Sequence, residues 1–211
     1  MTEELKSLVD KGEMLPLMEE FYTIQGEGYY KGTAAYFVRI GGCDVGCHWC
    51  DVKESWNAGD HEILSVEKII SDAKNTPAKL IILTGGEPLM YDLGYLCKQL
   101  HLAGFQINIE TSGAYPFSGE IDWVCFSPKK FKEPKEEFFS LADELKVVVF
   151  HSSDIQWAEQ IASKITNKDC KLYLQPEWGK SEHVTDKIID FVKDNPDWNI
   201  SLQTHKYLNI R

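Results

Sequence analysis

Apolar residues recur at helical spacing along four stretches of the chain. The clearest set follows Ser65, which can cap a first turn, and it repeats at i, i+3, i+4 and i+7 as Val66, Ile69, Ile70 and Ala73. Ser153 and Gln156 form a candidate capping box ahead of another apolar stripe. The pattern therefore predicts helices that begin at residues 66 and 153, and further helices over 93–103 and 184–192.

Short apolar runs alternate with these helices and are typical of buried strands. The predicted strands cover residues 36–40, 79–83, 106–109, 123–126, 145–150, 172–174 and 200–202. This alternation predicts parallel β/α units, and no repeat or Pro/Gly/Ser-rich linker divides residues 1–211, so we expect a single domain. About six parallel strands are too few for the eight of a complete barrel. We therefore favour a partial, open β/α barrel, with a flat doubly wound sheet as the alternative.

Polar or glycine-rich segments follow the predicted strands. They are residues 84–88, 110–113, 127–129, 175–177 and 203–205, and residues 43–50 follow the strand that ends at Ile40. The carboxyl ends of parallel strands lie at one side of such folds, where the active site forms. We therefore expect these segments to converge on one site, whereas unrelated turns would be scattered.

The charge balance argues against one class of function. Asp and Glu number 33 and Lys and Arg 22, which gives a net charge of −11. General nucleic-acid binding needs a basic stripe, so we expect no nucleic-acid partner. No window approaches the roughly 20 apolar residues of a membrane helix, and residues 1–10 lack the features of a signal peptide. We therefore expect no membrane partner and a cytoplasmic location.

Three of the six cysteines lie in the run CDVGCHWC, as Cys43, Cys47 and Cys50. Three thiolates on a short loop can bind three irons of a cubane iron–sulfur cluster and leave the fourth iron open. The spacing leaves two alternatives, which are a structural zinc with His48 as fourth ligand and three reduced thiols without metal. The other three, which we interpret as small buried apolar residues, are Cys97, Cys125 and Cys170.

Two glycines and a glutamate follow the strand predicted over residues 79–83. Gly85 and Gly86 lack a Cβ, which permits a positive φ or a close approach of a ligand to the backbone. Glu87 would face the same site, where its carboxylate can accept hydrogen bonds from an ammonium group. A tight turn is the alternative for this segment taken alone.

The cysteine loop and the segment Gly85-Gly86-Glu87-Pro88 resemble the cluster motif and the glycine-rich motif of radical S-adenosylmethionine enzymes. More closely, the chain resembles the 7-carboxy-7-deazaguanine synthase family of 7-deazapurine (queuosine) biosynthesis. The segments that carry this resemblance span nearly the whole chain and are residues 23–28, 37–39, 43–51, 127–129 and 203–211. The short chain also fits the trimmed barrel of this family.

The resemblance implies an activity and a set of cofactors. The substrate would be 6-carboxy-5,6,7,8-tetrahydropterin, and the product 7-carboxy-7-deazaguanine, formed with release of ammonia. A 4Fe–4S cluster on the three cysteines would bind S-adenosylmethionine, and a 5′-deoxyadenosyl radical would abstract a substrate hydrogen before ring contraction. A flavodoxin or ferredoxin would donate the electron, and the enzyme would be a homodimer.

Carried over residue by residue, the resemblance also implies two groups of contacts. The substrate would be contacted by Ile24, Gln25, Gly26, Arg39, Thr84 and the carboxylate of Arg211. The S-adenosylmethionine site would comprise His48, Trp49, Cys50, Asp51, Gly86, Glu87, Ser127, Pro128, Lys129, Gln175 and Pro176.

The chemistry of four side chains agrees with a carboxylated pterin as substrate. Gln25 and Glu27 suit the donor–acceptor edge of a pterin, and His205 lies at a strand end beside the tail. Arg39 suits a carboxylate, because its planar fork binds carboxylates at two points. Taken alone, Arg39 would equally suit an ion pair with a surface acid.

One position departs from the family pattern. The family usually has Ser or Thr directly after Cys50-Asp51, where the hydroxyl helps to hold a Mg²⁺ bound to the substrate. Here the residue is Val52, whose side chain has no oxygen. Since Mg²⁺ often keeps several waters, binding through substrate and water remains open, but we hypothesise that Mg²⁺ dependence is weakened or lost.

Two other functions share the cysteine spacing. One is a radical-generating activase that acts on a protein partner, which would need a peptide-binding surface that nothing in the sequence specifies. The other is a non-catalytic zinc or iron–sulfur module, which the set of polar strand ends disfavours. Anaerobic reconstitution and an absorption spectrum separate such a module from the two enzymes.

Overall fold

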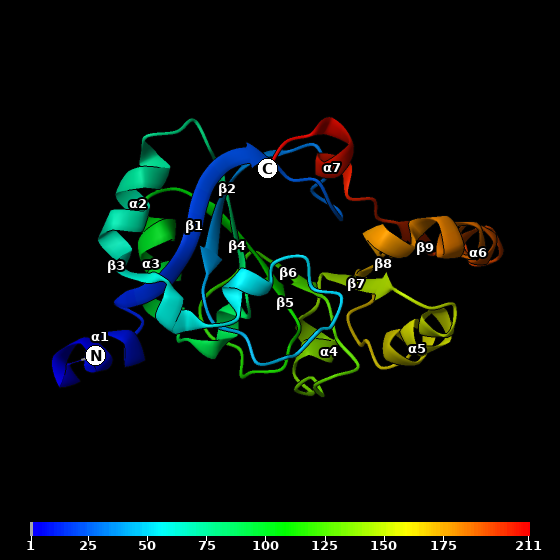
Figure 1. Cartoon of the computed structure of the whole chain (residues 1–211), viewed down its shortest axis with the longest axis horizontal. Helices are drawn as coiled ribbons and strands as arrows, with labels where there is room; N and C mark the ends of the chain where they lie inside the picture. The colour runs from blue at the N-terminus through cyan, green and yellow to red at the C-terminus, as the bar shows by residue number, and fades with distance from the viewer. Residues whose placement is uncertain (1) are drawn as a thin grey trace.

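The computed structural model describes residues 2–211, and all its strands belong to one nine-stranded sheet (Figure 1). The strands are β1 (Met14–Ile24), β2 (Ala34–Ile40), β3 (Glu62–Ser65), β4 (Leu80–Gly85), β5 (Gln106–Thr111), β6 (Trp123–Phe126), β7 (Glu144–Val149), β8 (Lys171–Pro176) and β9 (Trp198–Ile200). The α-helices are α1 (Glu3–Asp10), α2 (Val66–Lys74), α3 (Gly94–Leu102), α4 (Phe138–Leu141), α5 (Ser153–Ala162), α6 (Ser181–Asp194) and α7 (Thr204–Leu208). Four short 3-10 turns are η1 (Lys53–Ser55), η2 (Ala58–Asp60), η3 (Pro88–Met90) and η4 (Trp178–Lys180).

The sheet is an open barrel wall of parallel strands. Its order is β3-β1-β2-β4-β5-β6-β7-β8-β9, and every neighbouring pair from β2 to β9 is parallel. The outermost strands, β3 and β9, are not paired with each other, so the barrel does not close. The prediction of a partial β/α barrel is therefore confirmed, and each of the seven predicted strand ranges has its counterpart among the seven parallel strands, one more than the estimate of about six.

Two antiparallel strands at one edge of the sheet were not predicted. β1 pairs with both β2 and β3 in antiparallel fashion. It contains Pro16 and the adjacent acids Glu19 and Glu20, which interrupt the alternation that marks a strand. The pairing register also shifts within β1, between Leu17 and Glu19. This strand forms because β2 offers it a partner, and a local sequence pattern does not contain that information.

Four helices pack outside the barrel wall, with α2 and α3 on the side of β1 to β4 and with α5 and α6 beside β7 to β9 (Figure 1). The start of α2 confirms its predicted cap, because the Ser65 hydroxyl accepts a hydrogen bond from the Lys68 amide at 3.3 Å. The predicted capping box at Ser153 is wrong. The Asp154 carboxylate accepts the amides of Phe150 and His151 instead, at 2.9 and 2.8 Å. These amides precede the helix, so the Asp154 carboxylate ties the preceding turn to α5 and does not cap its first turn.

Alternation along the parallel strands separates the core from the functional face. Side chains in a strand point to opposite faces in turn. Positions on one face, which include Val38, Ile81, Ile107, Leu145 and Leu174, form the main core under the helices. Positions on the other face carry a small apolar cluster of Ala35, Phe37, Leu80 and Ile82 and the polar side chains Arg39, Glu110, Lys146 and Gln175. The inner face of the barrel is thus largely polar.

Two of the three cysteines outside the cysteine loop are buried, as predicted. Cys97 and Cys125 are buried, and Cys170 is partly buried against the main core. Among residues 2–211, no helix combines the length and the apolar character that crossing a membrane requires.

Candidate active site

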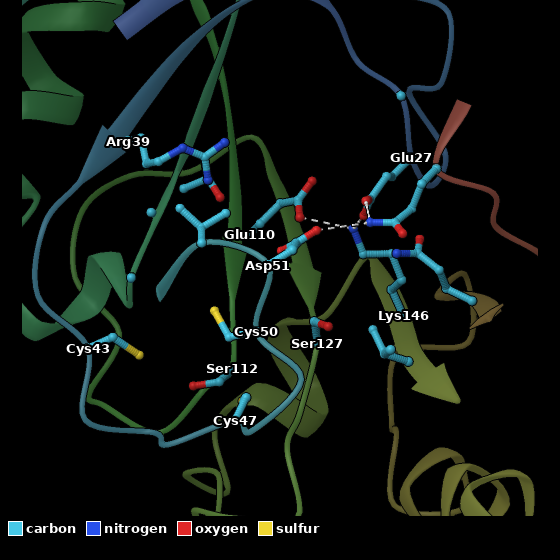
Figure 2. A pocket seen from close by; sticks show the side chains of 18 of the residues that line it. Glu27, Arg39, Cys43, Cys47, Cys50, Asp51, Glu110, Ser112, Ser127 and Lys146 are labelled. Atoms are coloured by element: carbon cyan, nitrogen blue, oxygen red, sulfur yellow. Dashed lines mark hydrogen bonds and ion pairs between the residues drawn. The ribbon is translucent and has the colours of Figure 1, made fainter. Parts of the chain in front are cut away.

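A cavity of about 310 Å³ lies at the carboxyl ends of the parallel strands (Figure 2). The predicted site residues that line it are Ile24, Gln25, Gly26, Glu27, Arg39, Cys43, Cys47, Trp49, Cys50, Asp51, Thr84, Gly86, Glu87, Ser127, Lys129, Gln175, His205 and Arg211. All six segments that follow the strands contribute, so their predicted convergence is confirmed. Three predicted residues do not line the cavity: Pro128 and Pro176 are buried beside lining residues, and His48 is exposed.

The loop that carries the three cysteines is fixed at several points. The Cys43 amide donates to the Trp56 carbonyl at 3.0 Å. Gly42, just before it, has a φ of 110°, which residues with a Cβ rarely adopt. Further along the loop, Cys47 packs against Ala114 in a small apolar cluster. The surrounding fold therefore fixes the loop that carries the three thiols.

Gly85 and Gly86 allow the end of β4 to lie directly against the cysteine loop. Gly85 has a φ of 140°, and a Cβ there would overlap the backbone of Ile40. A Cβ at Gly86 would overlap the Gly42 carbonyl and lie 2.8 Å from the Cβ of Cys43. The Gly86 amide also donates to the Ile40 carbonyl at 2.9 Å. The glycine motif thus positions the cysteine loop as well as lining the cavity.

The three thiols line one end of the cavity (Figure 2). Within residues 2–211, no three His, Cys, Asp or Glu side chains converge on a single metal ion, as a mononuclear zinc would require. A cubane cluster takes one thiolate for each iron and needs no such convergence. Burial raises the pKa of the Cys43 thiol and raises that of Cys47 to about 11, so cluster loading releases protons. The donor set fits a three-thiolate cluster with an open iron.

His48 points away from the cavity. Its ring packs edge-on against Phe131 and Phe150, with centroids 5.4 and 4.9 Å away. It is therefore not placed as a fourth zinc ligand beside the three thiols. Its side chain is not part of the cavity wall either, so its predicted contact with S-adenosylmethionine stays a prediction.

Glu87 braces two strand ends against each other. Its side chain is buried, and the residue is 1% exposed. One carboxylate oxygen accepts from the Thr111 hydroxyl, and the other accepts from the amide (2.8 Å) and hydroxyl of Ser112. The brace joins the end of β4 to the end of β5. A contact with the ammonium group of a cofactor, as predicted from the sequence, would have to share these oxygens.

Lys129 provides a positive charge near the thiols. Its ammonium donates to the carbonyl and the hydroxyl of Ser127 and lies 5.9 Å from the centroid of the Trp49 ring. Burial lowers the pKa of Lys129. The side chain is therefore oriented toward the part of the cavity that the cysteine loop encloses.

The opposite side of the cavity contains a buried charge network, which we call the Lys146 network (Figure 2). The Lys146 ammonium donates to Glu27 at 2.7 Å and to Glu110 at 2.9 Å, and its side chain is 3% exposed. Gln203 donates to Glu27 at 2.9 Å, and Gln25 donates to Glu110 at 2.8 Å. Burial raises the pKa of Glu27, but the Lys146 charge and these hydrogen bonds more than offset it and hold that pKa at about 2.

Arg39 lines the cavity and also forms an ion pair. Its Nε donates to Glu19 at 2.8 Å, and its side chain is 18% exposed. The ion pair with an acid was the alternative for this residue, and the structure shows it together with a place in the cavity wall. Because the bond uses Nε, the terminal nitrogens of the guanidinium remain for a ligand.

The tail, residues 203–211, forms the mouth of the cavity. The Thr204 amide and hydroxyl both donate to the Gly26 carbonyl, at 2.9 and 2.8 Å. The His205 ring packs so closely on Gly26 that a Cβ there would overlap it. At its end, the Arg211 carbonyl accepts from the Thr23 hydroxyl at 3.2 Å. The tail thus joins the segment after β1 to the site.

The cavity wall also contains residues that were not among the predicted site residues, and these include Glu110, Lys146, Gln203 and Lys206. Glu110 and Gln203 belong to strand-end segments that the sequence had singled out. Lys146 interrupts an apolar strand, and a charged residue in a buried strand is rarely tolerated without a partner. This interruption could have identified Lys146 from the sequence as a candidate site residue. Lys206 lies in the tail segment 203–211, which the sequence had singled out, but it was given no role there.

Comparison with known proteins identifies relatives along the whole chain. The family model described as the radical SAM superfamily matches residues 37–150. A 7-carboxy-7-deazaguanine synthase from Flavobacterium psychrophilum is 57% identical over 210 residues, which cover 100% of this chain and 99% of that protein. One from Synechocystis is 44% identical, with 93% of each chain covered.

A solved structure agrees with these relatives. The crystal structure of QueE from Escherichia coli superimposes with a TM-score of 0.82 at 29% sequence identity, covering 95% of this chain and 98% of that chain. The open barrel described above is therefore found in an experimental structure as well.

Proposed function

The chain belongs to the 7-carboxy-7-deazaguanine synthase family of the radical SAM superfamily, and from this premise we propose which of its residues perform the reaction. The enzyme converts 6-carboxy-5,6,7,8-tetrahydropterin to 7-carboxy-7-deazaguanine with release of ammonia, in queuosine and 7-deazapurine biosynthesis. Its cofactors are a 4Fe–4S cluster and S-adenosylmethionine.

We assign the cluster to Cys43, Cys47 and Cys50, because these thiols line one end of the cavity and do not converge on one ion. When bound, the cluster and S-adenosylmethionine supply a carbon-centred radical that abstracts a substrate hydrogen. The wall beside the thiols contains Gly86 and Lys129, which would contact the cofactor. Gly86 lets the ligand approach the backbone closely, and Lys129 brings a positive charge for a carboxylate.

The substrate would bind between Arg39 and the Lys146 network. The terminal nitrogens of Arg39 suit the pterin carboxylate. Gln25 and Glu27 offer both donors and acceptors to the polar edge of a pterin, and Lys146 fixes the position of the Glu27 carboxylate at 2.7 Å. A rigid network of this kind orients a ligand without reorganisation during the reaction.

His205 would act on protons at the mouth of the cavity. Burial lowers the pKa of His205, so its imidazole is neutral at neutral pH and can accept a proton or a hydrogen bond. Loss of ammonia from the substrate requires proton movement, and His205 lines the cavity where the tail meets Gly26.

The observation that carries this proposal is that three cysteines on one loop and a carboxylate-binding arginine line the same 310 Å³ cavity. The test incubates reconstituted enzyme with a reductant, S-adenosylmethionine and the carboxytetrahydropterin. We expect the deazaguanine product, detected by mass. Formation of 5′-deoxyadenosine without any product from the pterin would reject the substrate assignment. Cys50→Ala should abolish both products, and retained turnover would remove the cluster from the mechanism.

We further propose the partners that the family resemblance implies. A flavodoxin or ferredoxin would reduce the cluster, and the enzyme would act as a homodimer in the cytoplasm. Pull-down with each reductant class, followed by an activity assay with the purified donor, tests the first point. Sedimentation of the reconstituted enzyme tests the second.

A further inference from the structure

The corner of the cavity at Val52 provides no oxygen for a metal ion. The Val52 side chain lines the cavity and is a hydrocarbon. Its carbonyl oxygen already accepts the amide of Ser55 at 3.1 Å and the hydroxyl of Ser55 at 2.7 Å. Both lone pairs of that carbonyl are therefore used by η1.

The carboxylate next to Val52 already has a positively charged partner. Asp51 Oδ2 accepts from the Lys206 ammonium at 2.9 Å and from the Gln203 amide at 3.5 Å. Mg²⁺ requires near-ideal octahedral coordination by six oxygens. Asp51 is the acid adjoining Val52, and its Oδ2 is already paired with the Lys206 ammonium. This corner does not fit the divalent cation that the family uses.

Lys206 is held in place from three sides. Besides Asp51, its ammonium donates to the Gln203 side-chain oxygen at 3.1 Å and lies 5.3 Å from the centroid of the Trp178 ring. Its helix, α7, is anchored by the hydrogen bonds of Thr204 to Gly26. The side chain is 23% exposed and lines the cavity.

An ammonium group has three donors, and Asp51 and Gln203 take two of them. The third donor of Lys206 is left for a ligand in the cavity. A lysine in this position therefore presents a positive charge where a metal ion would otherwise neutralise a bound carboxylate.

We propose that the Lys206 ammonium, positioned by Asp51, replaces Mg²⁺ in this enzyme and binds the carboxylate of the substrate together with Arg39. The inference rests on the proposed function, because it assumes the carboxytetrahydropterin as substrate. The feature particular to this chain is Val52, because Lys206 lies in the tail segment that carries the family resemblance. A hydrocarbon is acceptable at position 52 when no metal has to be held there.

The test measures binding rather than turnover. The probe is 6-carboxypterin, the fully oxidised form of the substrate, which has no hydrogen at C6 to be abstracted. Its affinity for the reconstituted enzyme with S-adenosylmethionine is measured by equilibrium dialysis, with and without Mg²⁺. We expect no effect of Mg²⁺ on the wild type and a loss of roughly tenfold or more in Lys206→Met, since one charge-assisted hydrogen bond disappears.

Three further variants and one further ligand define the controls. Lys53→Met removes a lysine near the same loop that does not line the cavity, and it should bind the probe like the wild type. Lys206→Arg keeps the charge and should retain most of the affinity. Unsubstituted pterin, which lacks the carboxylate, should bind the wild type and Lys206→Met equally. Val52→Thr combined with Lys206→Met should regain affinity when Mg²⁺ is added.

Three outcomes would overturn the inference. The first is a saturable increase in wild-type affinity for the probe with Mg²⁺. The second is unchanged probe binding by a Lys206→Met variant that unfolds at the wild-type temperature. The third is that Lys206→Met loses affinity for S-adenosylmethionine instead of affinity for the probe. Failure of the wild type to bind the probe or to convert the carboxytetrahydropterin would instead reject the proposed function itself.

Discussion

Replacing Lys146 with methionine removes the cation that both Glu27 and Glu110 contact. Methionine has a similar length and fills the same space, so the substitution leaves little cavity. What changes is that two carboxylates lose an ammonium at 2.7 and 2.9 Å. The hydrogen bonds that they accept from Gln203 and Gln25 remain, but these amide donors are neutral and do not compensate the negative charges.

The loss of folding stability depends on how far the two carboxylates are buried. Breaking a buried ion pair by removing one partner costs about 3–5 kcal/mol. The side chains of Glu27 and Glu110 are 15% and 23% exposed. Water therefore partly solvates both carboxylates, and the lower end of that range applies. About 3 kcal/mol corresponds to a fall of roughly 6–12 °C in Tm for a chain of this size.

The loss of stability caused by Lys146→Met should also depend on pH. In the wild type, the pKa of Glu27 is about 2 when folded and 4.5 ordinarily, so its contribution is complete above pH 4.5 and is lost as the pH falls toward 2. Without Lys146, burial raises the pKa of Glu27 instead. The variant then loses stability as the pH rises through 4.5. The difference between the two proteins is therefore largest at neutral pH and narrows in acid.

The assay is thermal and urea unfolding at about pH 7 and about pH 5, with both proteins in the same state of cluster loading. Lys171→Met is the matched control, because Lys171 lies on the neighbouring strand β8 but is exposed, and it should change stability by less than about 0.5 kcal/mol. Adding Glu27→Gln to Lys146→Met should recover part of the loss. A penalty under about 1 kcal/mol, or one equal at both pH values, would refute the reasoning.

Three more predictions concern the rest of the molecule. Burial and the neighbouring Asp72 raise the pKa of Glu20 from 4.5 to about 7, so Glu20→Gln should raise Tm at pH above 7 and leave it nearly unchanged near pH 4.5; an equal shift at both would contradict this. Gly86→Ala should lower the iron bound per chain after reconstitution, because its Cβ would displace the cysteine loop, whereas Gly59→Ala, whose nearest contact would be 3.3 Å away, should load normally. Arg39→Met should raise the KM for the pterin by roughly tenfold or more with little change in S-adenosylmethionine cleavage, and equal losses in both would point to misfolding.

The sequence predicted the convergence of the site better than it predicted the sheet. Residues 84–88 and 127–129 were expected to meet because parallel strands share one carboxyl edge whatever their exact pairing. β1 was missed because its formation depends on β2 and because Pro16, Glu19 and Glu20 disguise its periodicity. Pairing between strands is a property of distant residues, and local patterns do not encode it.

Side-chain direction explains the remaining differences at the site. His48 lies within the cysteine motif, yet its ring packs on Phe131 and Phe150, contacts that the motif alone does not specify. The capping box predicted at Ser153 does not form, and the Asp154 carboxylate instead accepts the amides of Phe150 and His151, which precede α5. In both cases the direction of the side chain is set by contacts that the local motif does not specify.

The Lys146 network has a consequence for how the protein folds and unfolds. Lys146 lies 119 residues from Glu27 and 36 from Glu110 along the chain, and Gln203 lies 176 residues from Glu27. Contacts between such distant residues require costly loop closure and tend to form late. Interactions that form after the folding transition state mainly slow unfolding. The charges that line the cavity should therefore slow the unfolding of the protein and have little effect on its folding rate.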